Sequence, residues 1–145
     1  MSSLHVVFRV AEGEYAVAAS DVLQMESYSG ATRVPGALPY VAGVVQVRGR
    51  VVPVIDVRAR FGLPALPPSL DSRVVVLQFR DRTVGLLVDS AREVVKLTPE
   101  QIQPPPRLVA EGADGFVKAV AHLDKRLLML VDFVKIIGED PVYGN

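Results

Sequence analysis

Short runs of β-branched and aromatic residues recur along the chain, separated by turn-forming residues. The run at 6–10 reads Val-Val-Phe-Arg-Val, the segment 11–14 contains Gly and two Glu, and the apolar pattern resumes at 15–18. Runs of this length between Gly, Pro, Asp and Asn residues are typical of β-strands. The pattern predicts a hairpin here and a mostly β fold.

Three further hairpins are predicted by the same pattern, at residues 44–55, 74–88 and 117–131. Pro53 lies inside the second of them. Because proline has no N–H to donate to a strand ladder, it predicts an edge position or a bulge at that point. Helical signals are sparse. Thr98-Pro99-Glu100-Gln101 has an N-cap residue followed by proline, and it predicts a single helical turn.

The chain also contains an internal repeat. Residues 8–24 align with 77–93, and residues 36–62 align with 112–138, in each case without a gap. The first hairpin therefore corresponds to the third, and the second to the fourth.

The repeat divides the chain into approximate halves at 5–63 and 73–139, with a Pro-rich connector at 64–72. A half of roughly seventy residues is near the lower limit for an independent hydrophobic core, so we expect the halves to pack together as one domain, 1–145. Small units of many short strands close best as barrels, because closure removes exposed strand edges. We therefore predict two small barrels with a groove between them.

Composition limits the classes of partner. Sixteen basic and sixteen acidic residues cancel, so no overall field favours nucleic acid or an anionic membrane. There is no Cys, which excludes disulfides and is compatible with a reducing cytoplasm. The apolar runs are too short to span a membrane, and the N-terminus lacks the features of a secretion signal. We expect a cytoplasmic protein that recognises its partners locally and does not insert into the membrane.

No combination of residues in the sequence points to catalysis. The only histidines, His5 and His122, lie in separate strand patterns without a second ligand at metal spacing. Asp56 and Asp132 occupy equivalent places after strands, where capping of backbone N–H groups explains them better than acid catalysis. We predict no catalytic residue, no metal site and no cofactor, which makes an enzyme the least favoured class.

The segment Arg48-Gly49-Arg50 is a basic cluster at a predicted hairpin tip. Side chains at such tips reach solvent and partners, so both a solvated turn and a binding role remain open from the residues alone. A nucleic-acid-binding β-barrel is the alternative of another class. Barrels of that kind need a charged track with exposed aromatic side chains, and the sequence shows neither beside this tip.

Residues 34–58, VPGALPYVAGVVQVRGRVVPVIDVR, closely resemble the central signature of the CheW-like family. Residues 85–94, GLLVDSAREV, resemble its second signature, and 127–138 extend the resemblance over nearly the whole chain. The resemblance implies two SH3-like five-stranded β-barrels on a shared hydrophobic core. It also implies a non-catalytic adaptor that couples the cytoplasmic tip of a methyl-accepting chemoreceptor to the regulatory domain of a CheA-type histidine kinase within a signalling array.

In that family the receptor's helical hairpin docks in the groove between the barrels. Carried over to this chain, the resemblance implies that the receptor-binding residues are Val22, Gln24, Met25, Gln46, Val47 and Arg48. An amphipathic helix would lay apolar side chains on this surface, while the arginine donates hydrogen bonds to a carboxylate or carbonyl. Other CheW-like proteins are a further class of partner. The resemblance assigns no kinase-binding residues.

Two of these positions depart from the family's pattern. Gln24 stands where the family typically has Glu, and Gln46 stands where it has Asn. The first change removes a charge and the second lengthens an amide, both within the expected receptor surface. The alternative hypothesis is therefore a specialised paralogue that binds the kinase or another CheW-like protein but has lost ordinary receptor coupling.

Overall fold

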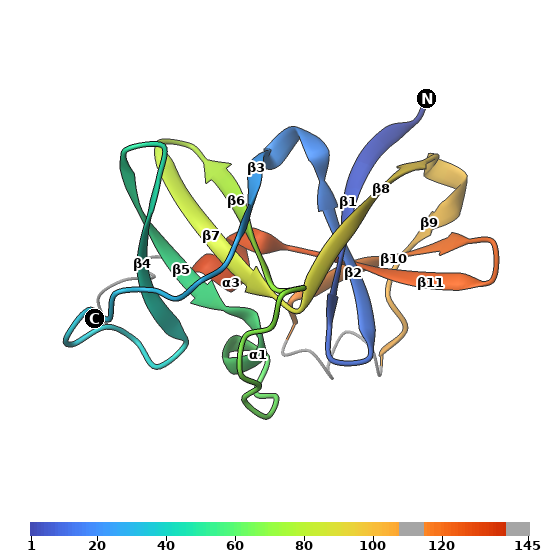
Figure 1. Cartoon of the computed structure of the whole chain (residues 1–145). Coiled ribbons are helices and arrows are strands. Elements are labelled where there is room, and N and C mark those ends of the chain that lie inside the picture. The colour runs from blue at the N-terminus through green and yellow to red at the C-terminus, as the bar shows by residue number, and fades with distance from the viewer. Residues whose placement is uncertain (108–114, 139–145) are drawn as a thin grey trace.

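The computed structural model describes residues 1–107 and 115–138, most of which lie in two β-sheets (Figure 1). Among these residues the first sheet has six strands, in the order β8 (Ser90–Leu97), β1 (Ser3–Val10), β2 (Gly13–Ala18), β11 (Arg126–Val131), β10 (Val117–Leu123) and β9 (Ile102–Gln103). The second has five, in the order β3 (Val22–Ser27), β6 (Arg73–Phe79), β7 (Arg82–Val88), β5 (Arg50–Asp56) and β4 (Val41–Val47). The helical elements are short: α1 (Val57–Arg60), α3 (Phe133–Ile137) and the 3-10 turns η1 (Ala19–Asp21) and η2 (Pro99–Gln101).

All four predicted hairpins are present, and each has a two-residue loop. The first loop residue has a positive φ in every case: Ala11, Arg48, Arg80 and Asp124. In the β4–β5 loop Gly49 also has a positive φ, which is the signature of a type I′ turn. Such turns match the right-handed twist of the flanking strands. The prediction of a mostly β fold built from hairpins is confirmed.

The two sheets do not follow the two halves of the sequence. Hairpins β1–β2 and β10–β11 lie in the six-stranded sheet, joined by parallel pairing of β2 with β11. Hairpins β4–β5 and β6–β7 lie in the five-stranded sheet, joined by parallel pairing of β5 with β7. Each half of the chain thus contributes one hairpin to each sheet, so neither sheet corresponds to one half of the repeat. The boundaries 5–63 and 73–139 stay a prediction about the sequence repeat.

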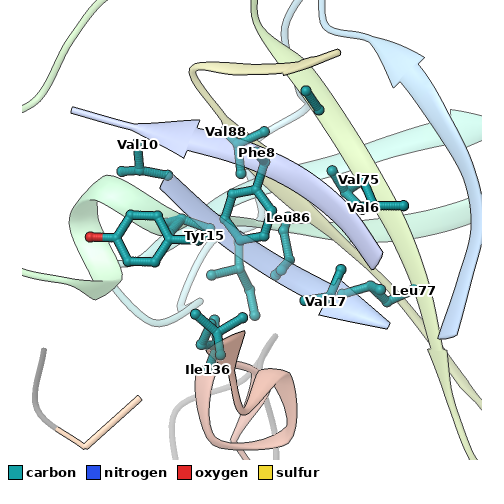
Figure 2. Packing of buried hydrophobic residues seen from close by; sticks show 14 of the residues in the cluster. Val6, Phe8, Val10, Tyr15, Val17, Val75, Leu77, Leu86, Val88 and Ile136 are labelled. Atoms are coloured by element: carbon teal, nitrogen blue, oxygen red, sulfur yellow. The ribbon is translucent and has the colours of Figure 1, made fainter. Parts of the chain in front are cut away.

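Three clusters of buried apolar side chains hold this arrangement together. The largest lies between the sheets and includes Phe8 of β1, Leu77 of β6 and Leu86 of β7, all fully buried (Figure 2). A second cluster is built on the six-stranded sheet and a third on the five-stranded sheet. Each sheet therefore has a core of its own and also contributes to a common one, as the predicted shared hydrophobic core requires.

An ion pair stabilises the connection between β7 and β8, where the chain passes from one sheet to the other. Asp89 lies between β7 and β8, and its carboxylate accepts hydrogen bonds from Arg58 Nε at 2.9 Å and Nη2 at 2.7 Å. The same carboxylate accepts from the backbone N–H of Ala11, in the β1–β2 loop, at 2.8 Å. Burial by itself would raise the pKa of Asp89, but these donors outweigh it and hold the pKa below its usual value.

The two predicted helix caps have different outcomes. The Asp56 carboxylate accepts hydrogen bonds from the N–H groups of Arg58 and Ala59 at the start of α1, so that prediction is confirmed. Asp132 precedes α3, where the structure has no side-chain cap, so the second prediction is wrong. There the backbone carbonyl of Asp132 accepts from Lys135 instead. The equivalence of the two repeats therefore does not extend to the side-chain cap, although the backbone N–H groups of Asp56 and Asp132 bond to the equivalent carbonyls of Tyr40 and Phe116.

Replacing Asp89→Asn is expected to lower the free energy of unfolding by about 1–3 kcal/mol at pH 7, because it leaves the Arg58 guanidinium without its counter-charge. The loss should shrink as the pH falls below 3.8, the ordinary pKa of the group, where the native carboxylate also loses its charge. Urea titrations followed by circular dichroism at pH 7 and pH 3 measure both effects. Asp71→Asn is the matched control, because its ion pair with Arg92 is exposed. Equal losses of stability for the two variants would contradict the stabilising role of the Arg58–Asp89 ion pair.

His5 in β1 is 8% exposed, and its Nδ1 is buried with no hydrogen-bond partner in the described part of the chain. Burial lowers the pKa of His5 below its usual value, and the nearby positive charge of Lys118 acts in the same direction. The unfolded chain therefore takes up a proton at a higher pH than the folded chain, and stability falls as the pH drops through 6.5.

We expect a loss of at most about 1.4 kcal/mol in the free energy of unfolding between pH 7.5 and pH 5.5. The variant His5→Gln should remove this pH dependence, whatever its effect on stability at pH 7.5. Urea titrations at the two pH values test this, with His122→Gln, at an exposed position of β10, as the control. An unchanged pH dependence in the His5 variant would show that another group is responsible.

Candidate functional site

A groove of about 650 Å³ opens beside strand β4. It is lined by residues 26–32, which end β3 and follow it, by residues 44–47 of β4, and by Val51 and Val74. All of these belong to the five-stranded sheet and its connections, so this β3–β4 groove lies within one sheet. This location differs from the docking groove expected from the sequence, which lay between the two barrels.

The groove exists because the segment that follows β3 pairs with β4 at only one point among the described residues. Thr32 and Val44 exchange two backbone hydrogen bonds, of 2.9 and 2.8 Å. A side chain at Gly43 would place its Cβ 2.3 Å from the Thr32 carbonyl oxygen, so glycine permits this approach. Further along, Gly30 has a φ of 119° and forms no bridge to β4. The chain diverges there and the groove opens.

The single bridge also determines which backbone groups of β4 face the groove. Val44 directs its N–H and C=O to Thr32, on the side away from β5. Its partner in β5 is Pro53, which has no N–H to donate, so no ladder bond is lost. Pro53 is thus tolerated in a strand that lies between β7 and β4. Of the two predicted alternatives the edge position is wrong, while the β4–β5 pair does have a register shift close by, between Val41 and Gly43. Because backbone groups alternate sides along a strand, Gln46 directs its N–H and C=O toward the groove.

The three predicted site residues at the end of β4 lie in different environments. Gln46 and Val47 both line the groove. Val47 is only 6% exposed and belongs to the third core cluster, so its side chain offers little surface to a partner. Arg48 is exposed at the first position of the β4–β5 loop.

The predicted residues on β3 divide between its two faces. Val22 is half-buried and packs against the shared core, while Gln24 donates through Nε2 to the Glu26 carboxylate, which lines the groove. Met25 is 39% exposed and lies on the other face from Gln24, because it pairs with Val75 whereas Gln24 pairs with Val76. Leu23 is 48% exposed and lies where the register of β3 shifts, between Val22 and Gln24. Leu23 is not among the residues predicted to bind the receptor, and strand alternation does not identify it, because the register shift interrupts the alternation at this residue.

Arginines gather where the β4–β5 and β6–β7 loops meet, at one end of the five-stranded sheet. Arg50 Nη2 donates to Thr83 Oγ1 at 3.2 Å, so the two loops lie side by side, at the upper left of Figure 1. Arg48, Arg50 and Arg80 are all exposed. The sequence indicated only the first two, because their proximity to Arg80 depends on the parallel pairing of β5 with β7.

The groups around the groove are backbone donors and acceptors, apolar side chains and guanidinium groups. Such groups bind protein segments through strand pairing, apolar contact and charge-assisted hydrogen bonds. Within residues 1–107 and 115–138, no three His, Asp or Glu side chains gather in a way that could hold a metal ion. No helix in that part of the chain has the length and hydropathy needed to cross a membrane.

The sequence of this chain is similar to CheW-like proteins. CheW-like domains match this chain over residues 4–140. The chemotaxis protein CheW of Bacillus subtilis is 33% identical over 93% of this chain and 86% of its own length. The protein PilI of Pseudomonas aeruginosa is 38% identical over 68% of this chain and 55% of its own length.

The structural comparison agrees. The crystal structure of the scaffolding protein TtCheW from Thermoanaerobacter tengcongensis matches with a TM-score of 0.83 at 30% identity, over 91% of this chain and 90% of that one. The predicted CheW-like fold, with its two small β units on a shared core, is thereby confirmed. On the match over residues 4–140 and the identity to its relatives, the chain belongs to the CheW-like domain family.

Proposed function

We propose that the chain is a non-catalytic adaptor of a chemosensory pathway, coupling a chemoreceptor to a CheA-type histidine kinase within a signalling array. The observation that carries the proposal is the CheW-like match over residues 4–140, supported by relatives named chemotaxis protein CheW and scaffolding protein. An adaptor acts by presenting surfaces to two partners at once. Exposed edges and loops on a rigid double-sheet scaffold suit this task.

The receptor contact is proposed on the five-stranded sheet. Leu23 and Met25 form an exposed apolar pair on β3, which is the last strand in the sheet order. Pairing of Val22 with Leu77 places the start of β3 near the end of β6, toward the loop that carries Arg80. An amphipathic helix from the cytoplasmic tip of a methyl-accepting chemoreceptor can lay its apolar face on this pair.

Arg48 supplies the polar part of this proposed contact. Its guanidinium is exposed and donates several hydrogen bonds in a fixed plane, which fits a carboxylate or a helix-terminal carbonyl. Val22 and Val47 support the surface from inside, because both side chains pack into core clusters. The six residues named from the sequence thus separate into contacts and supports.

Gln24 motivates the alternative hypothesis of a specialised paralogue. Its amide donates to the Glu26 carboxylate two residues along the same strand. A glutamate at residue 24 would bring two like charges together, so the local environment here favours the neutral amide. Such a paralogue would bind the kinase or another CheW-like protein while the ordinary receptor contact is lost.

The remaining partners follow the same proposal. The kinase contact is with the regulatory domain, and other CheW-like proteins are further neighbours in the array. The protein acts in the cytoplasm and is recruited to membrane-associated or cytoplasmic receptor arrays. Nucleic-acid binding is not favoured, because the sixteen basic and sixteen acidic residues leave no net charge to attract a polyanion.

Arg48→Glu is expected to weaken binding of a purified receptor-tip fragment about tenfold or more, because a charge-assisted hydrogen bond is replaced by repulsion. The melting temperature should stay nearly unchanged, because Arg48 is exposed and has no ion pair with another described residue. Isothermal titration calorimetry and thermal melts measure the two quantities. Lys125→Glu, in the equivalent loop of the β10–β11 hairpin, is the matched control. Parallel loss of binding and of folding would count against the proposed contact.

Gln24→Glu distinguishes the adaptor from the specialised paralogue. If the family's charge at this position serves receptor coupling, the variant should bind a generic receptor tip more tightly than the natural chain does. Pull-downs with a standard CheW protein as the reference give the comparison. Natural binding as tight as the reference, with no gain in the variant, would rule out the paralogue hypothesis.

A further inference from the structure

We infer that the β3–β4 groove and the arginines beside it form a strand-addition site for a short, extended, acidic segment of a partner protein. This goes beyond receptor coupling, in which the proposed occupant is a helix on the exposed face of β3. Three observations carry the inference: an open strand edge, a set of arginines that have no carboxylate partner among the described residues, and a charge difference between the two ends of the groove.

The open edge is at Gln46. The Thr32–Val44 bridge begins an antiparallel ladder, which would continue by pairing Gly30 with Gln46. Gly30 has a φ of 119° and makes no such bridge, so the N–H and C=O of Gln46 face the groove without a backbone partner among the described residues. An extended peptide supplies the missing groups, and main-chain hydrogen bonds of this kind provide affinity in strand addition.

The arginines at the loop end of the groove differ from the ion-paired arginines of the structure. Arg58 and Arg126 each make bidentate pairs with carboxylates at 2.7–3.2 Å. Arg48, Arg50 and Arg80 are exposed, and none of them pairs with a carboxylate in the part of the chain that the structure describes. Guanidinium groups recognise carboxylates with two parallel hydrogen bonds, so these three favour an acidic ligand.

The two ends of the groove differ in charge, because Arg48, Arg50 and Arg80 outnumber Asp81, the one acidic residue of the two loops. Glu26 pairs with Val74 near the start of β6, whereas the arginines lie at the loop that follows the end of β6. An acidic residue of the bound segment therefore belongs at the loop end. Val51 pairs with Gln46 across β4 and β5 and is 66% exposed, so it offers an apolar contact beside the open edge. The segment that fits combines acidic with apolar residues.

A protein segment fits this site better than a nucleic acid does. An open strand edge presents donors and acceptors at the spacing of a peptide backbone. Binding of a single-stranded nucleic acid relies on aromatic side chains along a basic track. Of the residues that line the groove only Tyr28 is aromatic, and Glu26 interrupts the basic surface.

The probe is a fluorescein-labelled peptide of alternating Glu and Val, titrated with the full chain and followed by fluorescence anisotropy. Arg80→Glu should weaken its binding about tenfold or more, while Lys125→Glu leaves it unchanged. Gln46→Pro removes the N–H at the open edge and should also weaken binding, with little effect on the thermal melt because that N–H has no partner among the described residues. A peptide with Lys in place of Glu should bind at least tenfold more weakly.

Amide hydrogen exchange tests the open edge without any substitution. In the free protein the Gln46 amide should exchange fast and the Val45 amide slowly, because Val45 bonds to its β5 partner. Added peptide should slow the exchange of Gln46. A protected Gln46 amide in the free chain, equal binding to Arg80→Glu, or tighter binding of an oligothymidylate would each overturn the inference. Receptor binding is measured separately, so failure here leaves the proposed adaptor function to its own test.

Discussion

Burial of apolar side chains between the two sheets holds the whole domain together. Phe8, Leu77 and Leu86 reach it from three strands of two different sheets, while the clusters on the individual sheets are smaller. Each sheet needs the other to bury the apolar side chains of its inner face, because a unit of roughly half this chain buries too little surface alone. Because each half of the chain supplies one hairpin to each sheet, the shared core also joins the two halves of the repeat.

Arginine has two separate uses in the molecule. Arg58 forms an ion pair with Asp89, between β7 and β8. Arg60 lies over the Tyr40 ring and donates to the backbone carbonyl of Ile136 at 2.9 Å. These side chains fasten α1 to more distant parts of the fold. Arg48 and Arg80 lie at loop tips, where nothing in the described structure neutralises them. The same residue type therefore stabilises the scaffold in one place and offers charge to a partner in another.

The β3–β4 groove shows how small departures from regular strand geometry create a site. Gly43 lets the chain approach within hydrogen-bonding distance at Thr32, and Gly30 then turns it away from β4. Pro53 fits because the neighbouring residue of β4 bonds outward and not toward β5. If the segment after β3 paired with β4 along its whole length, Gln46 would have no free backbone groups to bind a partner.

The four hairpins, the cap at Asp56, the family and the exposed tip at Arg48 could all be predicted from the amino-acid sequence. The hairpins depend on neighbouring residues, since turn geometry and alternation set their register locally. Three features emerged only from the folded chain: hairpins from different halves share a sheet, the loop that carries Arg80 lies next to Arg50, and Val47 is core while Leu23 is surface. The parallel pairings and the shared core join residues far apart in the chain, and no local pattern encodes which distant strand becomes a neighbour.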